Sequence, residues 1–188
     1  MPPSNQQRRN DLTDAAIDII VRNGLHGLSH REVDEAARVP RGTASNYFRS
    51  RDALLEAAVR RVVELHFALI EQRRAQLPAT PSRRELIEFL IGVVEQALTR
   101  HRGRYIAMFE LVLEGTRRPE LQDAFASLAD EAIKLTQEAH RGGGELRDDV
   151  ASLNVIYNGV LFTSLVMPQT LGGRAPAEIT RDLLEVVL

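Results

Sequence analysis

Apolar residues recur every three or four positions through almost the whole chain, and this spacing constrains the fold more than any other feature. It is the period of a helix with one buried face, whereas a half-buried strand alternates apolar and polar residues. No convincing alternating run bounded by turn residues occurs among the 188 residues. Breaks at Gly24, Pro40, Pro78, Gly115 and the glycines of 142–144 divide the chain. We therefore expect an all-α protein of about nine helices.

Composition excludes several classes of protein. The chain has no cysteine, which removes disulfides, thiolate nucleophiles and cysteine-based zinc sites. The longest apolar segment, residues 155–167, is interrupted by Asn158 and is too short to cross about 30 Å of hydrocarbon. The first thirty residues carry charges throughout and lack the apolar stretch of a secretory signal. We expect a cytoplasmic protein that has no membrane partner.

Catalytic motifs are also missing from the sequence. A helical bundle that holds a carboxylate-bridged metal pair would show Glu-x-x-His, which does not occur. Neither a Gly-x-Ser-x-Gly elbow nor a Walker loop is present. Glu110 and Glu114 share a helical face, and we interpret that face as solvated. We therefore expect no enzyme, no metal site and no cofactor.

The first fifty residues read as three helices, of which two are short. A first helix with Leu12 and Ile20 on its apolar face stops at Gly24. Ser29 and Glu32 have the spacing of a capping box, so a second helix is predicted to start at Ser29. Pro40 ends it, and a third helix of about residues 41–48 follows. Two short helices joined by a tight turn and braced by a third are the ingredients of a helix-turn-helix.

The third helix has too few apolar residues to serve the core. Only Ala44 and Phe48 are ordinary core residues, and Tyr47 beside Phe48 cannot face the same way. The remaining side chains can bond phosphates or base edges. Residues 1–51 contain eight arginines and six acidic residues, a net charge of +2, although the whole chain has −2. Arg8 and Arg9, which we place before the first helix, form either a basic arm on DNA or a solvated terminus.

At this point the chain resembles the TetR family of bacterial one-component transcription regulators. The resemblance runs over about fifty residues and is carried by Ala15-Ala16, Gly24, Ser29, Val33, Ala36-Ala37, Val39, Arg41-Gly42-Thr43, Phe48, Arg51 and Leu54-Leu55. It implies an N-terminal helix-turn-helix DNA-binding domain, residues 1–52, and a helical ligand-binding and dimerisation domain, residues 53–188. The residues that it implies on DNA are Ser29, His30, Arg41, Thr43, Ser45, Asn46, Tyr47 and Arg51.

Four positions depart from the family pattern. Arg38 stands at the turn position usually held by glycine, and Pro40 stands where a serine cap is usual. Arg51 replaces a more common lysine, and both cations suit phosphate. Ser45 replaces an aromatic residue common in the middle of the recognition helix, so base preferences do not transfer from the family.

For the second domain, the resemblance implies a small-molecule cavity whose filling changes the separation of two recognition helices in a dimer. Apolar residues at heptad spacing, starting at Leu121 and Phe125, and the small Gly159 and Ser164 on a later helix predict a four-helix dimer interface. Weaker polar candidates for the cavity are His66, His101, Asn154 and Asn158. The larger candidates, which favour an apolar ligand, are Phe67, Phe89, Tyr105, Met108, Phe109, Phe125, Tyr157, Phe162 and Met167.

These observations predict a homodimeric repressor that binds a palindromic operator on double-stranded DNA and is released by a small ligand. The alternative is a helical small-molecule-binding or adaptor protein with a degenerate DNA-binding head, an option that the unusual Arg38 and Pro40 keep open.

Overall fold

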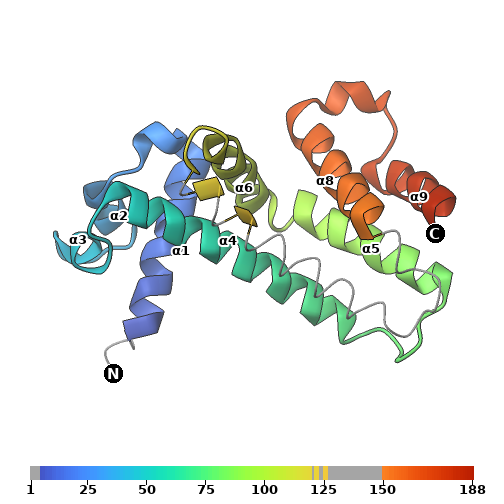
Figure 1. The fold of residues 1–188 in the computed structure, drawn as a ribbon, viewed down its shortest axis with the longest axis horizontal. Coiled ribbons are helices and arrows are strands. Elements are labelled where there is room, and N and C mark those ends of the chain that lie inside the picture. Colours follow the sequence, from blue (N-terminus) through green and yellow to red (C-terminus); the bar gives the residue numbers. More distant parts are fainter. Residues whose placement is uncertain (1–4, 120, 123–124, 127–149) are drawn as a thin grey trace. The chain divides into compact units, whose positions relative to one another are not determined.

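The computed structural model describes residues 5–119, 121–122, 125–126 and 150–188, and every regular element in these ranges is helical (Figure 1). The predicted all-α class is thus confirmed. The chain divides into two compact units, Met1–Leu65 with Gly103–Leu128, and His66–Arg102 with Ala129–Leu188. The functional boundary that we expect after residue 52 stays a prediction. The elements are α1 Asn5–Asn23, η1 Leu25–Gly27, α2 His30–Ala36, α3 Thr43–Tyr47, α4 Arg51–Arg74, α5 Arg83–Leu98, α6 Arg102–Gly115, α8 Val150–Val166, η3 Pro168–Leu171 and α9 Pro176–Val187.

The first unit is built around the three N-terminal helices. The side chains of Leu12, Ile20 and Phe48 are buried in one core together with Leu54 of α4 and Leu111 of α6. α1 ends at Asn23 because Gly24 takes a φ of 68°, a left-handed conformation that ends a helix at little cost for glycine. The turn that follows leads the chain into α2, which packs on α1 and α3.

Hydroxyl caps begin three helices, and the one at Ser29 stands where the capping-box spacing predicts a helix start. The Ser29 Oγ accepts a hydrogen bond from the Glu32 N–H (3.2 Å), and the Ser50 Oγ accepts one from the Ala53 N–H (3.0 Å). Ser82 forms a full capping box with Glu85 at the start of α5. The box at Ser29 has only its first half, since the Glu32 carboxylate pairs with Arg31.

The second unit contains α5, α8 and α9, which pack on one another. Their shared core includes Ile87, Ile91, Leu153 and Leu184. On α9 the buried leucine is Leu184, whereas the spacing predicts Leu183, which is exposed. Of the predicted heptad helix, only a few residues around Leu121 and Phe125 are described; the other heptad positions, Leu128, Ala132, Leu135 and Ala139, lie outside the described residues.

Two other local expectations are wrong. The apolar spacing of the second helix predicts Ala36 on its inward face, but Ala36 is exposed, because the short α2 turns Val33 and Asp34 to the core instead. Arg8 and Arg9 are not in an arm before the first helix: α1 begins at Asn5 and includes both.

Candidate nucleic-acid interface

The short α3 divides its residues between the core and the outside. Ala44 and Phe48, one turn apart, are buried in the core of the first unit. Ser45 and Asn46 lie on the other side and are exposed, and Arg41 just before the helix leaves 82% of its side chain exposed. α3 therefore presents an outward row of polar side chains on a helix that is held in place by two apolar ones.

The predicted interface residues differ in exposure. Ser29, Arg41, Ser45 and Asn46 are exposed, whereas Thr43 and Tyr47 are half-buried. Two hydroxyls also bond locally: the Thr43 Oγ1 donates to the Pro40 carbonyl (2.6 Å), and the Ser45 Oγ donates to the Gly42 carbonyl (3.0 Å). A hydroxyl that donates in this way keeps its lone pairs for an incoming donor.

Asp34 of α2 caps α3 from outside the helix. Its Oδ2 accepts a hydrogen bond from the Gly42 N–H and its Oδ1 accepts one from the Ala44 N–H, both at 2.7 Å. Only 2% of Asp34 is exposed. The first N–H groups of a helix lack intrahelical acceptors, and Gly42 at the N-cap has no side chain to supply one. A carboxylate from the neighbouring helix therefore does what a local serine would do.

The sequence patterns do not predict this role of Asp34. The one available signal is the absence of a local cap: neither Pro40 nor Gly42 carries a side-chain acceptor before α3. An acidic residue on the preceding short helix is then the nearest replacement. Its identity depends on how α2 and α3 pack, which spacing alone does not indicate.

The turn between α2 and α3 forces one arginine into a glycine-like conformation. Arg38 has a φ of 54° and is the one non-glycine residue with positive φ among those that the structure describes. A left-handed residue brings its Cβ close to the following carbonyl, which costs about 1 to 2 kcal/mol. The turn thus keeps the backbone geometry that glycine usually supplies, although the Cβ of Arg38 makes that geometry less favourable.

His30 and Arg51 brace the segment that surrounds α3. The His30 Nε2 lies 2.7 Å from the Phe48 carbonyl oxygen, a hydrogen bond from the start of α2 to the end of α3. The Arg51 guanidinium donates through Nη2 to the Leu25 carbonyl (2.5 Å) and through Nε to the Leu28 carbonyl (3.3 Å). Both side chains are half-buried, so each has a structural task beside any contact with DNA.

Arg9 of α1 reaches the end of α3 as well. Its guanidinium carbon lies 4.6 Å from the centre of the Phe48 ring, and its Nη1 donates to the Tyr47 carbonyl (3.5 Å). A cation over an aromatic face is attracted by the ring quadrupole. Arg9 thus adds a positive charge beside the recognition helix from a part of the chain that we expected to be an arm or a solvated terminus.

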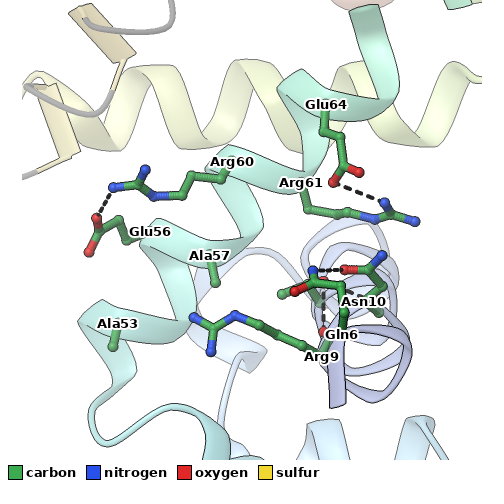
Figure 2. A pocket seen from close by; sticks show the side chains of 10 residues that line it. Gln6, Arg9, Asn10, Ala53, Glu56, Ala57, Arg60, Arg61 and Glu64 are labelled. Carbon is green, nitrogen blue, oxygen red and sulfur yellow. Dashed lines mark hydrogen bonds and ion pairs between the residues drawn. The ribbon is translucent and has the colours of Figure 1, made fainter. Parts of the chain in front are cut away.

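A polar hollow of about 410 Å³ lies between α1 and α4 in the same unit (Figure 2). Its arginines already have partners. Arg60 pairs with Glu56 (2.6 Å), and Arg61 makes a two-pronged pair with Asp14 (2.8 and 3.0 Å) and a third bond to Glu64 (3.0 Å). We interpret the hollow as a structural seam, because Arg60 and Arg61 are balanced by neighbouring carboxylates and Arg9, which also lines it, lies over the Phe48 ring.

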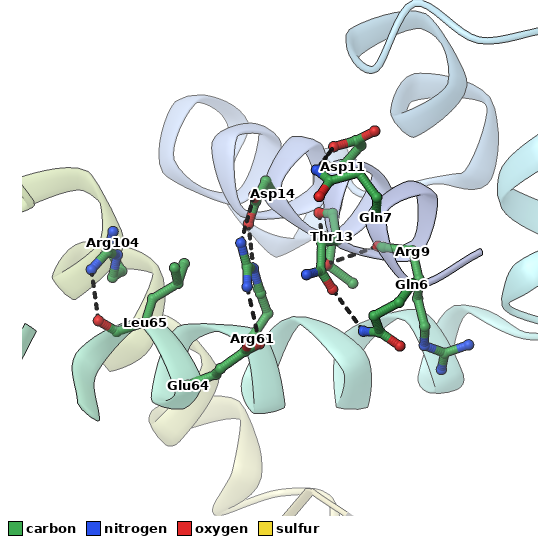
Figure 3. A network of polar contacts seen from close by, with 11 residues as sticks. Gln6, Gln7, Arg9, Asp11, Thr13, Asp14, Arg61, Glu64, Leu65 and Arg104 are labelled. Carbon is green, nitrogen blue, oxygen red and sulfur yellow. Dashed lines mark hydrogen bonds and ion pairs between the residues drawn. The ribbon is translucent and has the colours of Figure 1, made fainter. Parts of the chain in front are cut away.

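The polar network behind this seam ties α1, α4 and α6 together (Figure 3). The hydrogen bonds to Asp14 raise the pKa of Arg61 above its usual range. Arg104 donates to the Leu65 carbonyl (3.1 Å), and burial lowers the pKa of its guanidinium. The two shifts oppose each other because carboxylates stabilise the charged form of Arg61, whereas burial disfavours the charged form of Arg104, which bonds a neutral carbonyl.

The predicted cavity residues fall into separate groups. In the first unit, Met108 and Phe125 pack against the core, and Tyr105 is almost fully buried. In the second unit, the His66 ring lies 5.5 Å from Phe67 and 5.6 Å from Tyr157. Phe89 lines a cavity of about 190 Å³ in that unit. Phe109 and Phe162 are half-buried, and Met167 is exposed.

Metal sites and membrane spans are absent from the described part of the chain. No cluster of three or more histidine or acidic side chains there could hold a metal ion. Among the helices in those ranges, none is both long and apolar enough to span a bilayer.

Comparison with known proteins adds two family matches. A model described as "Bacterial regulatory proteins, tetR family" matches residues 12–58, and one described as "Tetracyclin repressor-like, C-terminal domain" matches residues 81–188. The transcriptional regulator BetI of Paraburkholderia phymatum is 35% identical over 77 residues, which are 41% of this chain and 39% of that protein. BetI of Burkholderia mallei is 36% identical over 77 residues, which are 41% of this chain and 40% of that protein. The matched segment is therefore less than half the length of these relatives.

Solved structures match over nearly the full length. The multidrug binding protein EbrR, in complex with ethidium, has 28% identity and a TM-score of 0.70, covering 98% of this chain and 99% of its own. A TetR-family member from Streptomyces coelicolor A3 has 28% identity and a TM-score of 0.72, covering 97% of this chain and 98% of its own.

Proposed function

Because the chain belongs to the TetR family of bacterial transcriptional regulators, we propose that it is a homodimeric repressor that binds a palindromic operator through α3 and is released by a small ligand. A repressor of this kind acts in the cytoplasm, where bacterial DNA lies. The proposal assigns no catalytic step to the chain.

The outward face of α3 is the single observation that carries the DNA-binding part. Arg41 supplies a cation for phosphate or a guanine edge, and Asn46 supplies an amide that pairs with adenine in two-pronged fashion. Both are exposed, while Ala44 and Phe48 anchor the helix from behind. Thr43, Ser45 and Tyr47 complete the row, with Ser29 and His30 at the start of α2 and Arg51 at the start of α4.

Exposed apolar side chains on α8 and α9 support the dimer. Val155 is 72% exposed and Val186 is 86% exposed, and both line a shallow groove with Ile156 and Leu183. Gly159 on α8 has open space where a Cβ would stand. Contiguous apolar patches of this kind mark interaction surfaces on soluble domains. Two copies of this α8–α9 face would bury them; the heptad helix, which we predict to join α8 in a four-helix interface, lies mostly outside the described residues.

The aromatic group of the second unit supports a small apolar ligand. His66, Phe67 and Tyr157 come together from α4 and α8 and remain half-buried. Aromatic side chains with a few polar groups are typical linings of small-molecule sites. The structural relative EbrR was solved in complex with the small molecule ethidium.

Selection of random duplex DNA on the purified chain tests the proposal. We expect a palindrome with half-sites about 34 to 36 Å apart, or a multiple of this, and affinity that falls steeply with salt. Asn46→Ala should weaken binding to the selected sequence by about tenfold or more, with unchanged thermal stability. The exposed Gln72→Ala on α4 is the matched control and should bind as the original chain does.

Two results would contradict this function. If no sequence is enriched at low salt, even after any bound small molecule is removed, the head does not read DNA and the alternative of a ligand-binding or adaptor protein stands. If a palindrome is selected but Asn46→Ala binds it unchanged, α3 is not the element that reads the sequence.

A further inference from the structure

Arg73, near the end of α4, carries a buried polar atom without a partner. The Arg73 Nε is buried, and no acceptor in the described part of the chain bonds to it. The adjacent Arg74, by contrast, pairs with Glu71 (3.5 Å). An N–H group that is buried without an acceptor destabilises the folded state, so each such group in a native protein calls for an explanation. A bound ligand that supplies the missing acceptor is one such explanation.

Gly92 makes room for the Arg73 guanidinium. A Cβ built on Gly92 would lie 2.0 Å from the Arg73 Nη2 and 2.5 Å from its Cζ, far inside contact distance. Gly92 lies in the interior of α5, where glycine is less favourable than alanine. The chain thus combines two locally unfavourable choices, a buried unpartnered N–H and a helical glycine, at one contact between α4 and α5.

Apolar and aromatic side chains lie on both sides of this contact. His66 precedes Arg73 by seven residues, so it lies on the same face of α4, two turns and about 10 Å away. There it meets Phe67 and Tyr157. On α5, Phe89 lies one turn before Gly92 and lines the cavity of about 190 Å³, whose charged lining residue is Arg74, next to Arg73 in the chain. A charged group therefore stands among surfaces that suit an apolar ligand.

We propose that Arg73 binds the acid group of the effector, and that the effector is an amphiphilic carboxylic acid. The planar guanidinium matches a carboxylate through two parallel N–H donors, one of them Nε. The apolar body of the acid lies against the aromatic side chains around His66. This inference rests on the proposed function and refines its apolar ligand to one that carries a negative charge at one end.

Three probes with the same apolar body test the charge: phenylhexanoate, phenylhexanol and phenylhexylamine. Their affinities are measured by calorimetry on the full chain without DNA. We expect phenylhexanoate to bind at least about tenfold tighter than the alcohol or the amine, the preference typical of a charged hydrogen-bonded pair. Arg73→Gln should abolish that preference, and Arg84→Gln, a control at an exposed arginine of α5, should keep it.

Gly92→Ala tests the position of the guanidinium without removing its charge. The new methyl displaces the Arg73 side chain, so the preference for the acid should fall as it does in Arg73→Gln, while alanine favours the helix. Arg73→Met adds a second readout. Since it removes the unpartnered buried N–H, it should raise the thermal unfolding midpoint and abolish acid binding together, which a purely structural arginine would not show.

The inference is overturned if phenylhexanoate does not bind the original chain, if it binds no tighter than the alcohol, or if its advantage persists in Arg73→Gln. Its failure is distinguishable from that of the proposed function, because operator selection and the Asn46→Ala measurement require no ligand. A chain that selects a palindrome but ignores the acid remains a DNA-binding regulator with a different effector.

Discussion

Asp34 on α2 holds the N-terminus of the recognition helix by accepting a hydrogen bond from the Ala44 N–H at 2.7 Å. Its second carboxylate oxygen accepts from the Gly42 N–H at the same distance. The cap therefore joins the two helices of the helix-turn-helix and orients the one whose polar face we propose on DNA. Because the carboxylate is buried, removing it leaves two backbone N–H groups without acceptors.

Asp34→Ala should destabilise the chain by about 1 to 3 kcal/mol and weaken operator binding beyond the fraction that is unfolded. Urea unfolding, with DNA binding measured well below the transition, separates the two effects. Asp34→Asn keeps one acceptor oxygen, so its stability and its operator affinity should lie between those of Asp34→Ala and of the original chain. Asp18→Ala, at an exposed carboxylate of α1, is the control. Unchanged stability in Asp34→Ala would show that the cap contributes nothing.

Arg38→Gly should raise stability by up to about 1 kcal/mol. Relief of the left-handed strain at φ 54° stabilises the folded state, and the extra freedom of glycine in the unfolded chain offsets part of this gain. Arg38→Ala keeps the Cβ and should give no such increase. Thermal unfolding of both variants checks the prediction. A lower midpoint in Arg38→Gly would mean that the arginine side chain stabilises the turn.

Arg51→Ala should lower stability by about 1 to 3 kcal/mol, because the Leu25 and Leu28 carbonyls are left without their donor. If Arg51 also neutralises a phosphate, binding to all DNA sequences weakens and the salt slope falls by about one for each phosphate left unpaired. The neighbouring Arg49→Ala, which removes an exposed arginine, is the control for charge. A stable Arg51→Ala would contradict the bracing role.

Val186→Glu should convert the proposed dimer to a monomer, because it places a charge on the apolar face of α8 and α9. Light scattering at micromolar concentration measures the mass. Val112→Glu alters another exposed valine, on α6, and should leave the dimer intact. A dimer that survives Val186→Glu with full affinity would exclude this face as the interface.

The Glu88 carboxylate pairs with Arg181 through both oxygens (2.7 and 3.3 Å), which joins α5 to α9. The hydrogen bond from Arg181 lowers the pKa of Glu88 below its ordinary 4.5. A carboxyl group whose pKa is lower in the folded chain than in the unfolded chain stabilises the fold at pH values above the unfolded pKa. This contribution disappears as pH falls through the folded pKa. Glu88→Gln should therefore lower the unfolding midpoint slightly at pH 7, and the difference from the original chain should vanish in acid. A difference that persists in acid would contradict the ion pair as its cause.

Local patterns in the sequence were enough to predict the helical class and most helix ends. Ser29, Ser50 and Ser82 begin helices, and Gly24 follows the end of one, because caps act within one turn of the backbone. The inward Phe48 followed from the helical period in the same way. The polar face of α3, and with it the proposed interface, also followed from the sequence, because a helix with only two core residues must expose most of its side chains.

Only the tertiary structure decided which distant groups meet. Asp34 reaches Ala44 across a turn, Arg51 returns to Leu25, and Arg73 lies over Gly92, each pair set by how two helices pack. The Arg51 and Leu25 partners are 26 residues apart, far beyond the reach of a periodic pattern. For the same reason Leu184 rather than Leu183 is buried on α9. The helical period predicts an apolar face, but the packing of the neighbouring helices determines which residues of that face are buried.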